Sequence, residues 1–226
     1  MTEWILGIDD AGRGPVIGPM ILAGCLIDEK TRKYFKKIGI TDSKALTQKR
    51  REFFEKIIKE RAETFEVVVT PPIEIDGKNG DGIKLNEVEA IQCANIINKI
   101  NKGYGKIKVI IDCPSTSLVK WAEYLKTHIK DLSNLEISCE HKADKNHVVV
   151  SAASILAKCV REKEMALLKT EYGNEIGSGY TSDPLTIKFL EKYAIKHKDS
   201  GIFRKTWITW KNAFEKISQQ KLDFLF

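Results

Sequence analysis

Four aspartates stand where apolar segments end, a placement that suits catalysis or cation binding. Asp9 and Asp10 directly follow one apolar run, and Asp112 directly follows another. Asp144 lies between the last predicted strand and a long predicted helix. If the first two runs are neighbouring parallel strands, their carboxylates emerge at the same edge of the sheet. Side chains alternate faces along a strand, so the chain must turn for Asp9 and Asp10 to converge.

Clustered carboxylates predict a site for a hard divalent cation. Three or four carboxylates repel one another, and their pKa values rise unless a cation neutralises them. Because the ligands are oxygen atoms only, Mg²⁺ or Mn²⁺ is the expected ion. The usual chemistry of such a site is phosphodiester hydrolysis with two ions about 3.5–4 Å apart. The alternative is that the aspartates form turns and cap helices, and spacing alone favours that interpretation.

A glycine-rich turn follows the first two aspartates. Gly12, Arg13 and Gly14 combine a backbone that can approach a ligand closely, with its amides outward, and a guanidinium that can bind phosphate. The turn matches neither a P-loop nor the dinucleotide-binding glycine pattern. A lone Gly-Arg-Gly is also compatible with a tight hairpin.

Apolar periodicity predicts an α/β fold. Strands are expected at residues 4–8, 20–27, 65–70, 108–111 and 135–139. Helices are expected at residues 47–62, 83–100, 148–172, 184–197 and 204–218, and through Trp121 and Leu125, with a loop around Gly77, Gly80 and Gly82. This order predicts a mixed sheet, part antiparallel and part parallel, with flanking helices.

Composition excludes several classes of protein. In 226 residues, 42% are hydrophobic and 30% charged, which is typical of a globular protein and not of a disordered or fibrous one. No window approaches the roughly 20 apolar residues of a membrane span. Asp9 and Asp10 come too early for the apolar region of a signal peptide. We therefore expect a soluble cytoplasmic protein, and nothing in the sequence requires more than a monomer.

Cysteine usage and charge narrow the classes further. The formal net charge is +6, which is mild support for a polyanionic partner. Five cysteines without a CxxC pair favour free thiols over a disulfide framework or a zinc site. The cysteines are Cys25, Cys93, Cys113, Cys139 and Cys159.

Seven motifs, in this order along the chain, resemble the signature of type 2 ribonuclease H (ribonuclease HII). They are residues 7–15 (GIDDAGRGP), 42–46 (DSKAL), 111–112 (ID), 141–144 (HKAD), 151–158 (SAASILAK), 177–184 (GSGYTSDP) and 204–207 (RKTW). The HKAD and GSGYTSDP forms resemble the archaeal branch of the family. Seven ordered matches over nearly the whole chain outweigh the interpretation of the aspartates as turn formers.

The resemblance implies a ribonuclease H-like mixed β-sheet flanked by helices, with a small C-terminal helical extension. The implied activity is endonucleolytic hydrolysis of the RNA strand of RNA–DNA hybrids, and cutting 5′ of single ribonucleotides in duplex DNA. Such cutting leaves 5′-phosphate and 3′-hydroxyl ends. The expected divisions are a catalytic core at 1–175, a helical substrate-binding part at 176–217 and a tail at 218–226.

The resemblance also assigns roles to individual residues. The implied catalytic and metal-binding set is Asp9, Asp10, Asp112 and Asp144, holding two ions, Mg²⁺ or Mn²⁺. The implied substrate-binding residues are Gly12, Arg13, Gly14, Lys44, Lys142 and Tyr180. In this scheme the loop amides contact the 2′-hydroxyl, and Tyr180 stacks on the sugar of the next deoxynucleotide. Backbone amides can read a 2′-hydroxyl without base specificity, which suits discrimination of RNA from DNA.

Four other motif residues have simpler expected roles. His141 is expected to make a structural hydrogen bond. Ser154 is as compatible with helix packing as with substrate contact. Arg204 and Trp207 are expected to anchor the C-terminal helix to the core.

Position 10 departs from the family pattern, which has glutamate where this chain has Asp10. Aspartate reaches about 1.5 Å less far, and Mg²⁺ tolerates misplaced ligands poorly. We therefore expect an active enzyme with a weaker affinity for Mg²⁺ or a preference for Mn²⁺. The alternative is a catalytically weak protein that only binds hybrids. A third class, another nuclease or an integrase on the same fold, conflicts with the Gly-Arg-Gly turn and Tyr180.

The last eight residues (QQKLDFLF) loosely resemble the C-terminal peptides by which archaeal replication enzymes bind the sliding clamp. Leu225 stands where an aromatic residue is usual. The residues expected to bind this partner are Gln219, Leu222, Leu225 and Phe226. The alternative is a last helical turn that packs on its own protein.

Overall fold

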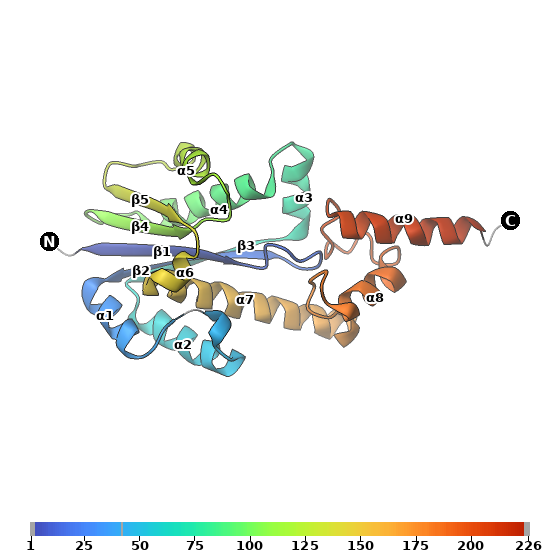
Figure 1. The fold of residues 1–226 in the computed structure, drawn as a ribbon, viewed down its shortest axis with the longest axis horizontal. Helices are drawn as coiled ribbons and strands as arrows, with labels where there is room; N and C mark the ends of the chain where they lie inside the picture. Colours follow the sequence, from blue (N-terminus) through green and yellow to red (C-terminus); the bar gives the residue numbers. More distant parts are fainter. Residues whose placement is uncertain (1–2, 42, 224–226) are drawn as a thin grey trace. The chain divides into compact units, whose positions relative to one another are not determined.

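The computed structural model describes residues 3–41 and 43–223, with side chains as far as residue 219. Within this part of the chain five strands form one sheet in the order β3-β2-β1-β4-β5. The strands are β1 (Trp4–Ala11), β2 (Met20–Asp28), β3 (Thr64–Thr70), β4 (Ile107–Asp112) and β5 (Leu135–Glu140). β1 runs antiparallel to β2 and parallel to β4, and β4 runs parallel to β5. The predicted mixed sheet is confirmed (Figure 1).

Helices account for most of the remaining described residues. They are α1 (Glu29–Lys37), α2 (Gln48–Arg61), α3 (Pro72–Gly80), α4 (Leu85–Ile100), α5 (Leu118–Thr127), α6 (Ala143–Asn146), α7 (Val148–Tyr172), α8 (Pro184–Tyr193) and α9 (Ile208–Asp223). Two 3₁₀ turns, η1 (Ser43–Ala45) and η2 (Asn174–Ile176), complete the set. None of the described helices is both long enough and apolar enough to cross a membrane.

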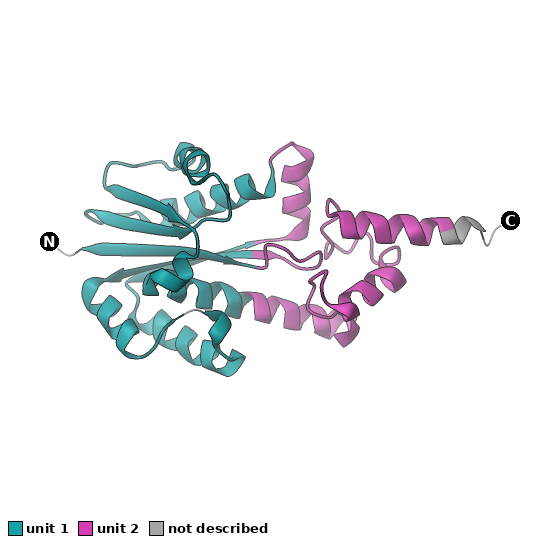
Figure 2. Cartoon of the chain, viewed as in Figure 1, with its two compact units in different colours: residues 1–11, 21–69, 84–160 teal, residues 12–20, 70–83, 161–226 magenta. Residues whose placement is uncertain are grey.

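The chain divides into two compact units, each built from separate segments (Figure 2). Unit 1 comprises residues 1–11, 21–69 and 84–160, and unit 2 comprises residues 12–20, 70–83 and 161–226. The domain boundaries expected from the sequence, at residues 175 and 217, stay predictions, because compactness does not test which segments fold or function separately.

Unit 1 is a sheet covered by helices on both faces. Figure 1 shows α1, α2 and the first part of α7 on one face, and α4 and α5 on the other. At Gly7 a Cβ atom would come within 2.5 Å of the Val149 backbone, so glycine permits the close approach of α7 to β1. Ala152 and Ala153 of α7 are completely buried in the same core. Small residues on both elements thus bring the start of α7 close to the middle of the sheet.

Unit 2 has its own apolar core, formed by residues from five segments. Its buried members are Val16, Ile17, Ile176, Phe189, Leu190, Ile202, Phe203 and Trp210. An isolated antiparallel bridge pairs Ile17 with Phe203. The loop at residues 12–20 is therefore fixed to the C-terminal part of the chain through both backbone pairing and side-chain burial.

Helix α3 occupies the stretch that the sequence predicted to be a loop, and that prediction is wrong. Pro72 stands in the first turn, where a missing N–H costs nothing. The Asp76 carboxylate accepts the backbone N–H groups of Lys205, at 2.6 Å, and Thr206, at 3.1 Å. These bonds to a distant segment stabilise a helix whose glycines disfavour it locally.

The other expected elements differ at their ends or by omission. Helix α7 has the predicted bounds. Helix α9 begins at Ile208, four residues later than expected, and its backbone continues to Asp223, into the expected tail. Helices α1 and α6 were not predicted. The five cysteines are free thiols, as expected.

Candidate active site

Three of the four predicted aspartates meet in unit 1. Asp9 lies near the end of β1, Asp112 ends β4, and Asp144 lies in the short helix α6. The parallel register pairs Ile8 with Ile111, so the next residue of each strand is an aspartate. One carboxylate oxygen from each of the three residues lies within 4.8 Å of the others. We call Asp9, Asp112 and Asp144 the carboxylate cluster.

The backbone after β5 joins Asp112 to the helix that carries Asp144. The Ala143 N–H donates to Asp112 Oδ1 at 3.0 Å, and the Lys142 backbone also hydrogen-bonds this carboxylate. Lys142 has φ = 57°, the only left-handed non-glycine residue in the described chain. That conformation turns the chain so that α6 begins directly over Asp112. The buried Asp144 is thereby presented to the other two carboxylates.

Asp9 is 6% exposed and is fixed by two donors. Its Oδ1 accepts the Asp10 backbone N–H at 2.8 Å, and the Ser154 side chain hydrogen-bonds the same carboxylate. Burial raises the pKa of Asp9 well above its ordinary value, and the charges of Asp10 and Asp112 add to this increase. The Ser154 hydrogen bond opposes the increase without cancelling it.

The cluster fits a divalent cation. Burial also raises the pKa of Asp112, and the neighbouring Asp144 charge raises it further. All three donors are oxygen atoms, the ligands that Mg²⁺ and Mn²⁺ prefer. The raised pKa values reflect burial and repulsion among the carboxylates, and a bound cation would neutralise that repulsion. The cluster could therefore hold a metal ion.

Asp10, the fourth predicted aspartate, lies outside the group of three. It follows Asp9 within β1, where successive side chains alternate faces. Its charge nevertheless raises the pKa of Asp9 more than the charge of Asp112 does, and it also raises the pKa of the Cys93 thiol of α4. The metal-binding role expected for Asp10 stays a prediction.

Two predicted cations and a histidine surround the cluster. The exposed Lys44, in η1, lowers the pKa of Asp112 through its charge, which places its ammonium within electrostatic reach of the cluster. The side chain of Lys142 is also exposed, while its backbone bonds Asp112. His141 Nδ1 lies 3.2 Å from the carbonyl oxygen of Cys113, which is the structural hydrogen bond expected for this residue.

In unit 2, Arg204 fixes the glycine-rich loop through hydrogen bonds to its backbone carbonyls. Its side chain is completely buried, although it carries a guanidinium. Nη2 donates to the carbonyl oxygen of Gly12 and Nη1 to that of Arg13, each at 2.6 Å. Nε and Nη2 both donate to the Gly18 carbonyl, at 3.1 and 3.0 Å. Arg204, four residues before α9, thus fixes this loop; its expected role as an anchor of the C-terminal helix stays a prediction.

These contacts determine which way the loop amides point. In a trans peptide the C=O and N–H point in opposite directions, and the described chain has no cis peptide. Since the carbonyls of Gly12 and Arg13 face Arg204, the N–H groups of Arg13 and Gly14 point away from it. The indole N–H of Trp207 donates a hydrogen bond to the Gly14 carbonyl oxygen at 3.1 Å. Gly14 itself is exposed, so two amides are directed outward beside accessible surface.

Arg161 joins the loop to Tyr180 within unit 2, a function that the sequence analysis missed. Its Nη1 donates to the Pro19 carbonyl at 3.0 Å and its Nη2 to the Ser178 carbonyl at 3.2 Å. The guanidinium lies 5.3 Å from the centre of the Tyr180 ring, which is 41% exposed. Gly12 has φ = +78°, and a Cβ there would come within 2.5 Å of the buried Arg161 side chain, so both conformation and space favour glycine. The only sequence signal for Arg161 is an arginine two helical turns after a run of small residues.

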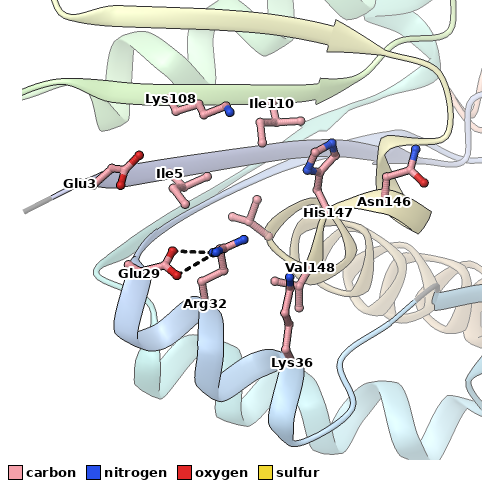
Figure 3. Close-up of a pocket in the computed structure, with 11 residues that line it drawn as sticks. Glu3, Ile5, Glu29, Arg32, Lys36, Lys108, Ile110, Asn146, His147 and Val148 are labelled. Carbon is pink, nitrogen blue, oxygen red and sulfur yellow. Dashed lines mark hydrogen bonds and ion pairs between the residues drawn. The ribbon is translucent and has the colours of Figure 1, made fainter.

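A separate depression of about 490 Å³ lies at the other end of β1 in unit 1 (Figure 3). Its described lining includes Lys36 and Lys108, but none of the carboxylate cluster. Glu29 and Arg32, also in the lining, neutralise each other through two hydrogen bonds of 2.6 and 2.7 Å. Its mixed charge distinguishes this depression from the acidic cluster.

The C-terminal residues expected to bind a partner are only partly described. Gln219 is exposed, and the backbone of Leu222 belongs to α9. Leu225 and Phe226 lie outside the described residues.

Solved structures define the fold class. The chain matches the crystal structure of ribonuclease H2 from Pyrococcus horikoshii OT3 with a TM-score of 0.84 and 36% identity, covering 95% of this chain and 99% of that one. It matches the ribonuclease HII of an Archaeoglobus fulgidus PCNA:RNase HII complex with a TM-score of 0.78 and 32% identity, covering 90% and 94%. The protein thus has the ribonuclease H-like fold that the resemblance implied.

The family follows from sequence comparison. The family model described as Ribonuclease HII matches residues 6–210. The Ribonuclease HII of Methanocaldococcus jannaschii is 40% identical over 230 residues, covering 96% of this chain and 98% of that protein. This chain belongs to the ribonuclease HII family and is a type 2 ribonuclease H, a hydrolase that acts as a nuclease.

Proposed function

We propose that this enzyme hydrolyses the RNA strand of RNA–DNA hybrids and cuts 5′ of single ribonucleotides in duplex DNA. The products have 5′-phosphate and 3′-hydroxyl ends. The observation that carries the proposal is the carboxylate cluster, whose oxygens approach within 4.8 Å in a chain of the ribonuclease HII family. Such cuts serve primer removal during replication and excision of ribonucleotides from DNA.

The residues divide the work between holding ions and holding substrate. Asp9, Asp112 and Asp144 would hold two Mg²⁺ or Mn²⁺ ions, with Asp10 as a fourth carboxylate ligand. When bound, these ions supply a nucleophilic water and stabilise the leaving oxygen. The amides that bond Asp112 keep its carboxylate aimed into the cluster before substrate arrives, so little reorganisation accompanies the reaction.

Recognition of RNA rests on the glycine-rich loop. The outward N–H groups of Arg13 and Gly14 donate to the ribose 2′-hydroxyl and its neighbouring phosphate. Where a deoxynucleotide follows the ribonucleotide, the exposed Tyr180 ring stacks on its sugar and so detects the RNA-to-DNA junction. Lys44 and Lys142 neutralise backbone phosphates. Because none of these contacts involves a base edge, cleavage is independent of sequence.

The direct test is cleavage of three end-labelled duplexes: an RNA–DNA hybrid, a DNA duplex with one ribonucleotide, and an all-DNA duplex. We expect cutting of the first two with Mg²⁺ or Mn²⁺, and none of the third. Asp112→Asn should abolish cutting while hybrid binding persists. If the wild-type protein binds hybrids but cuts none with either metal, the alternative of a catalytically weak hybrid-binding protein is correct.

Asp10 provides the test of metal preference. We propose that the shorter side chain weakens Mg²⁺ binding relative to Mn²⁺, because Mg²⁺ demands near-ideal octahedral geometry. Asp10→Glu should lower the Mg²⁺ concentration that gives half-maximal cleavage and change the Mn²⁺ value less. An unchanged ratio of the two values would contradict the proposal.

We also propose that residues 219–226 bind a sliding clamp. Support comes from the A. fulgidus relative, whose solved structure is a complex with PCNA, and from the exposed Gln219. A pull-down with purified clamp should retain the full chain and lose a chain that ends at Ser218. Retention of the shortened chain would place the interface elsewhere.

A further inference from the structure

Two buried serines connect a lysine to the carboxylate cluster through side chains alone. Lys158 Nζ donates a hydrogen bond to Ser43 Oγ. Ser43 Oγ lies 2.8 Å from Ser154 Oγ, and Ser154 hydrogen-bonds the carboxylate of Asp9. Ser43 and Ser154 are 0% and 1% exposed, and all four residues belong to unit 1. Three separate segments, β1, η1 and α7, thus meet in one hydrogen-bonded chain.

The two ends of this chain determine its direction. An ammonium group can only donate hydrogen bonds, and an ionised carboxylate can only accept them. Lys158 therefore donates to Ser43, the Ser43 hydroxyl donates to Ser154, and the Ser154 hydroxyl donates to Asp9. Hydrogen bonds aligned in one direction polarise one another, so the positive charge at Lys158 strengthens the bond at Asp9.

This hydrogen-bonded side-chain series differs from the usual case, in which a helix serine donates to a nearby backbone carbonyl. Ser151, one turn earlier on α7, donates to the backbone carbonyl of Asp144 at 2.6 Å. That bond pairs a buried hydroxyl with a backbone carbonyl of α6, the short helix directly before α7. Ser43 and Ser154 instead bond side chains from other segments, and their burial makes each lost partner costly.

We propose that Lys158, Ser43 and Ser154 form a positioning chain that holds the Asp9 carboxylate in the orientation that binds a divalent cation. Asp10 N–H already occupies Oδ1, so the Ser154 bond completes the restraint of the side chain. The remaining oxygen lone pairs are left to face Asp112 and Asp144. This inference rests on the proposed metal-binding role of the carboxylate cluster.

The test measures metal affinity on the free enzyme and needs no substrate. Mn²⁺ is titrated into the full-length protein by calorimetry and by electron paramagnetic resonance. Ser154→Ala should weaken Mn²⁺ binding about 10-fold or more, the usual effect of losing a group that orients a metal ligand. Ser43→Ala and Lys158→Met should weaken it by smaller factors. The double variant Ser43→Ala/Ser154→Ala should bind no more weakly than Ser154→Ala, because both changes break the same chain.

Controls separate positioning from loss of stability. Thr186→Val removes another completely buried hydroxyl, in unit 2, and Lys169→Met removes an exposed lysine of α7; both should retain wild-type Mn²⁺ affinity. Circular dichroism and melting in EDTA confirm that each variant is folded. If Ser154→Ala does not fold, Ser43→Ala and Lys158→Met carry the test.

The outcomes are distinct. If the folded variants of Ser154, Ser43 and Lys158 bind Mn²⁺ within twofold of the wild-type affinity, the positioning chain is overturned and the metal site stands. Fully additive losses in the double variant also overturn it, because independent effects need no chain. Absence of Mn²⁺ binding by the wild-type protein overturns the proposed metal site itself, and the positioning chain with it.

Discussion

At the scale of single residues, Asp9 is kept in the fold at an electrostatic cost. Its carboxylate is buried, and the charges of Asp10 and Asp112 oppose its ionisation. Both effects raise the pKa of Asp9. Such a cost is common where a residue is selected for binding and not for stability. A bound cation would turn the same repulsion into attraction.

Replacement of Asp9 should therefore separate stability from metal binding. Asp9→Asn keeps the shape and removes the buried charge, so we expect a higher melting temperature than wild type in EDTA. Mg²⁺ or Mn²⁺ should raise the melting temperature of wild type and have little effect on Asp9→Asn. Differential scanning calorimetry with and without metal measures both. A variant that is less stable in EDTA and still responds to metal would contradict this prediction.

Lys142 has an unfavourable backbone conformation. Its left-handed conformation is unfavourable by about 1–2 kcal/mol for a residue with a side chain. Lys142→Gly relieves that strain but adds about 0.5–1 kcal/mol of entropy to the unfolded chain. We expect unfolding in urea to show a net gain of about 0.5–1 kcal/mol.

The charge of Lys142 is tested by a second variant. Lys142→Ala keeps the strain and removes the ammonium, so it should bind hybrid more weakly without any gain in stability. Lys142→Gly should show the same loss of binding. Hybrid affinity equal to wild type in both variants would exclude a phosphate contact by this lysine.

At the scale of elements, short loops are fixed by side chains that begin or end helices. Asp183 caps the N-terminus of α8 by accepting the Leu185 N–H at 2.9 Å, and it accepts the Ser178 N–H at 2.7 Å. Hydrogen bonds from Ser178, together with the Leu185 N–H, lower the pKa of Asp183. One carboxylate thus defines both the helix start and the loop that carries Tyr180.

Loss of this cap should depend on pH. Asp183→Ala should lower the free energy of unfolding at pH 7 by about 1 kcal/mol, a typical cost for a lost N-cap. The folded pKa lies below the unfolded value near 3.9, so the contribution is complete above pH 3.9 and declines as pH falls through the folded pKa. Urea unfolding from pH 7 to pH 3 measures the change. Asp183→Asn, which still caps, should recover much of the loss; equal losses for Ala and Asn would contradict the mechanism.

At the scale of the whole molecule, net charge understates the attraction for nucleic acid. The formal charge of +6 includes the aspartates of the cluster, whose charge bound ions would neutralise. With metal bound, the remaining surface is therefore more basic than +6 indicates, which suits a polyanionic substrate.

Hybrid binding should therefore weaken as salt concentration rises. A plot of log affinity against log salt concentration should be linear with negative slope, because phosphate contacts release counterions. Lys44→Gln should reduce the slope by about 1 if its ammonium contacts one phosphate. Fluorescence anisotropy with Ca²⁺ in place of Mg²⁺ provides the measurement, and a slope unchanged by Lys44→Gln would exclude that contact.

Local pattern was sufficient to predict the sheet, helix α7 and the meeting of Asp9 with Asp112. Apolar runs define strands through burial, and the residue that ends each of two parallel neighbours must emerge at the same edge. The ordered motifs then led to the family, which the comparisons confirm.

Tertiary structure alone decided the contacts between distant segments. Helix α3 depends on Asp76 reaching Lys205 and Thr206, and the outward amides of the glycine-rich loop depend on the buried Arg204. Periodicity reports which residues are buried, but it carries no information about which polar partners a buried group finds. The sequence by itself therefore determined the enzyme's family and its candidate carboxylates. Only the folded chain decided how Asp9 is held and which three carboxylates approach within 4.8 Å, because both depend on strand register and long-range hydrogen bonds.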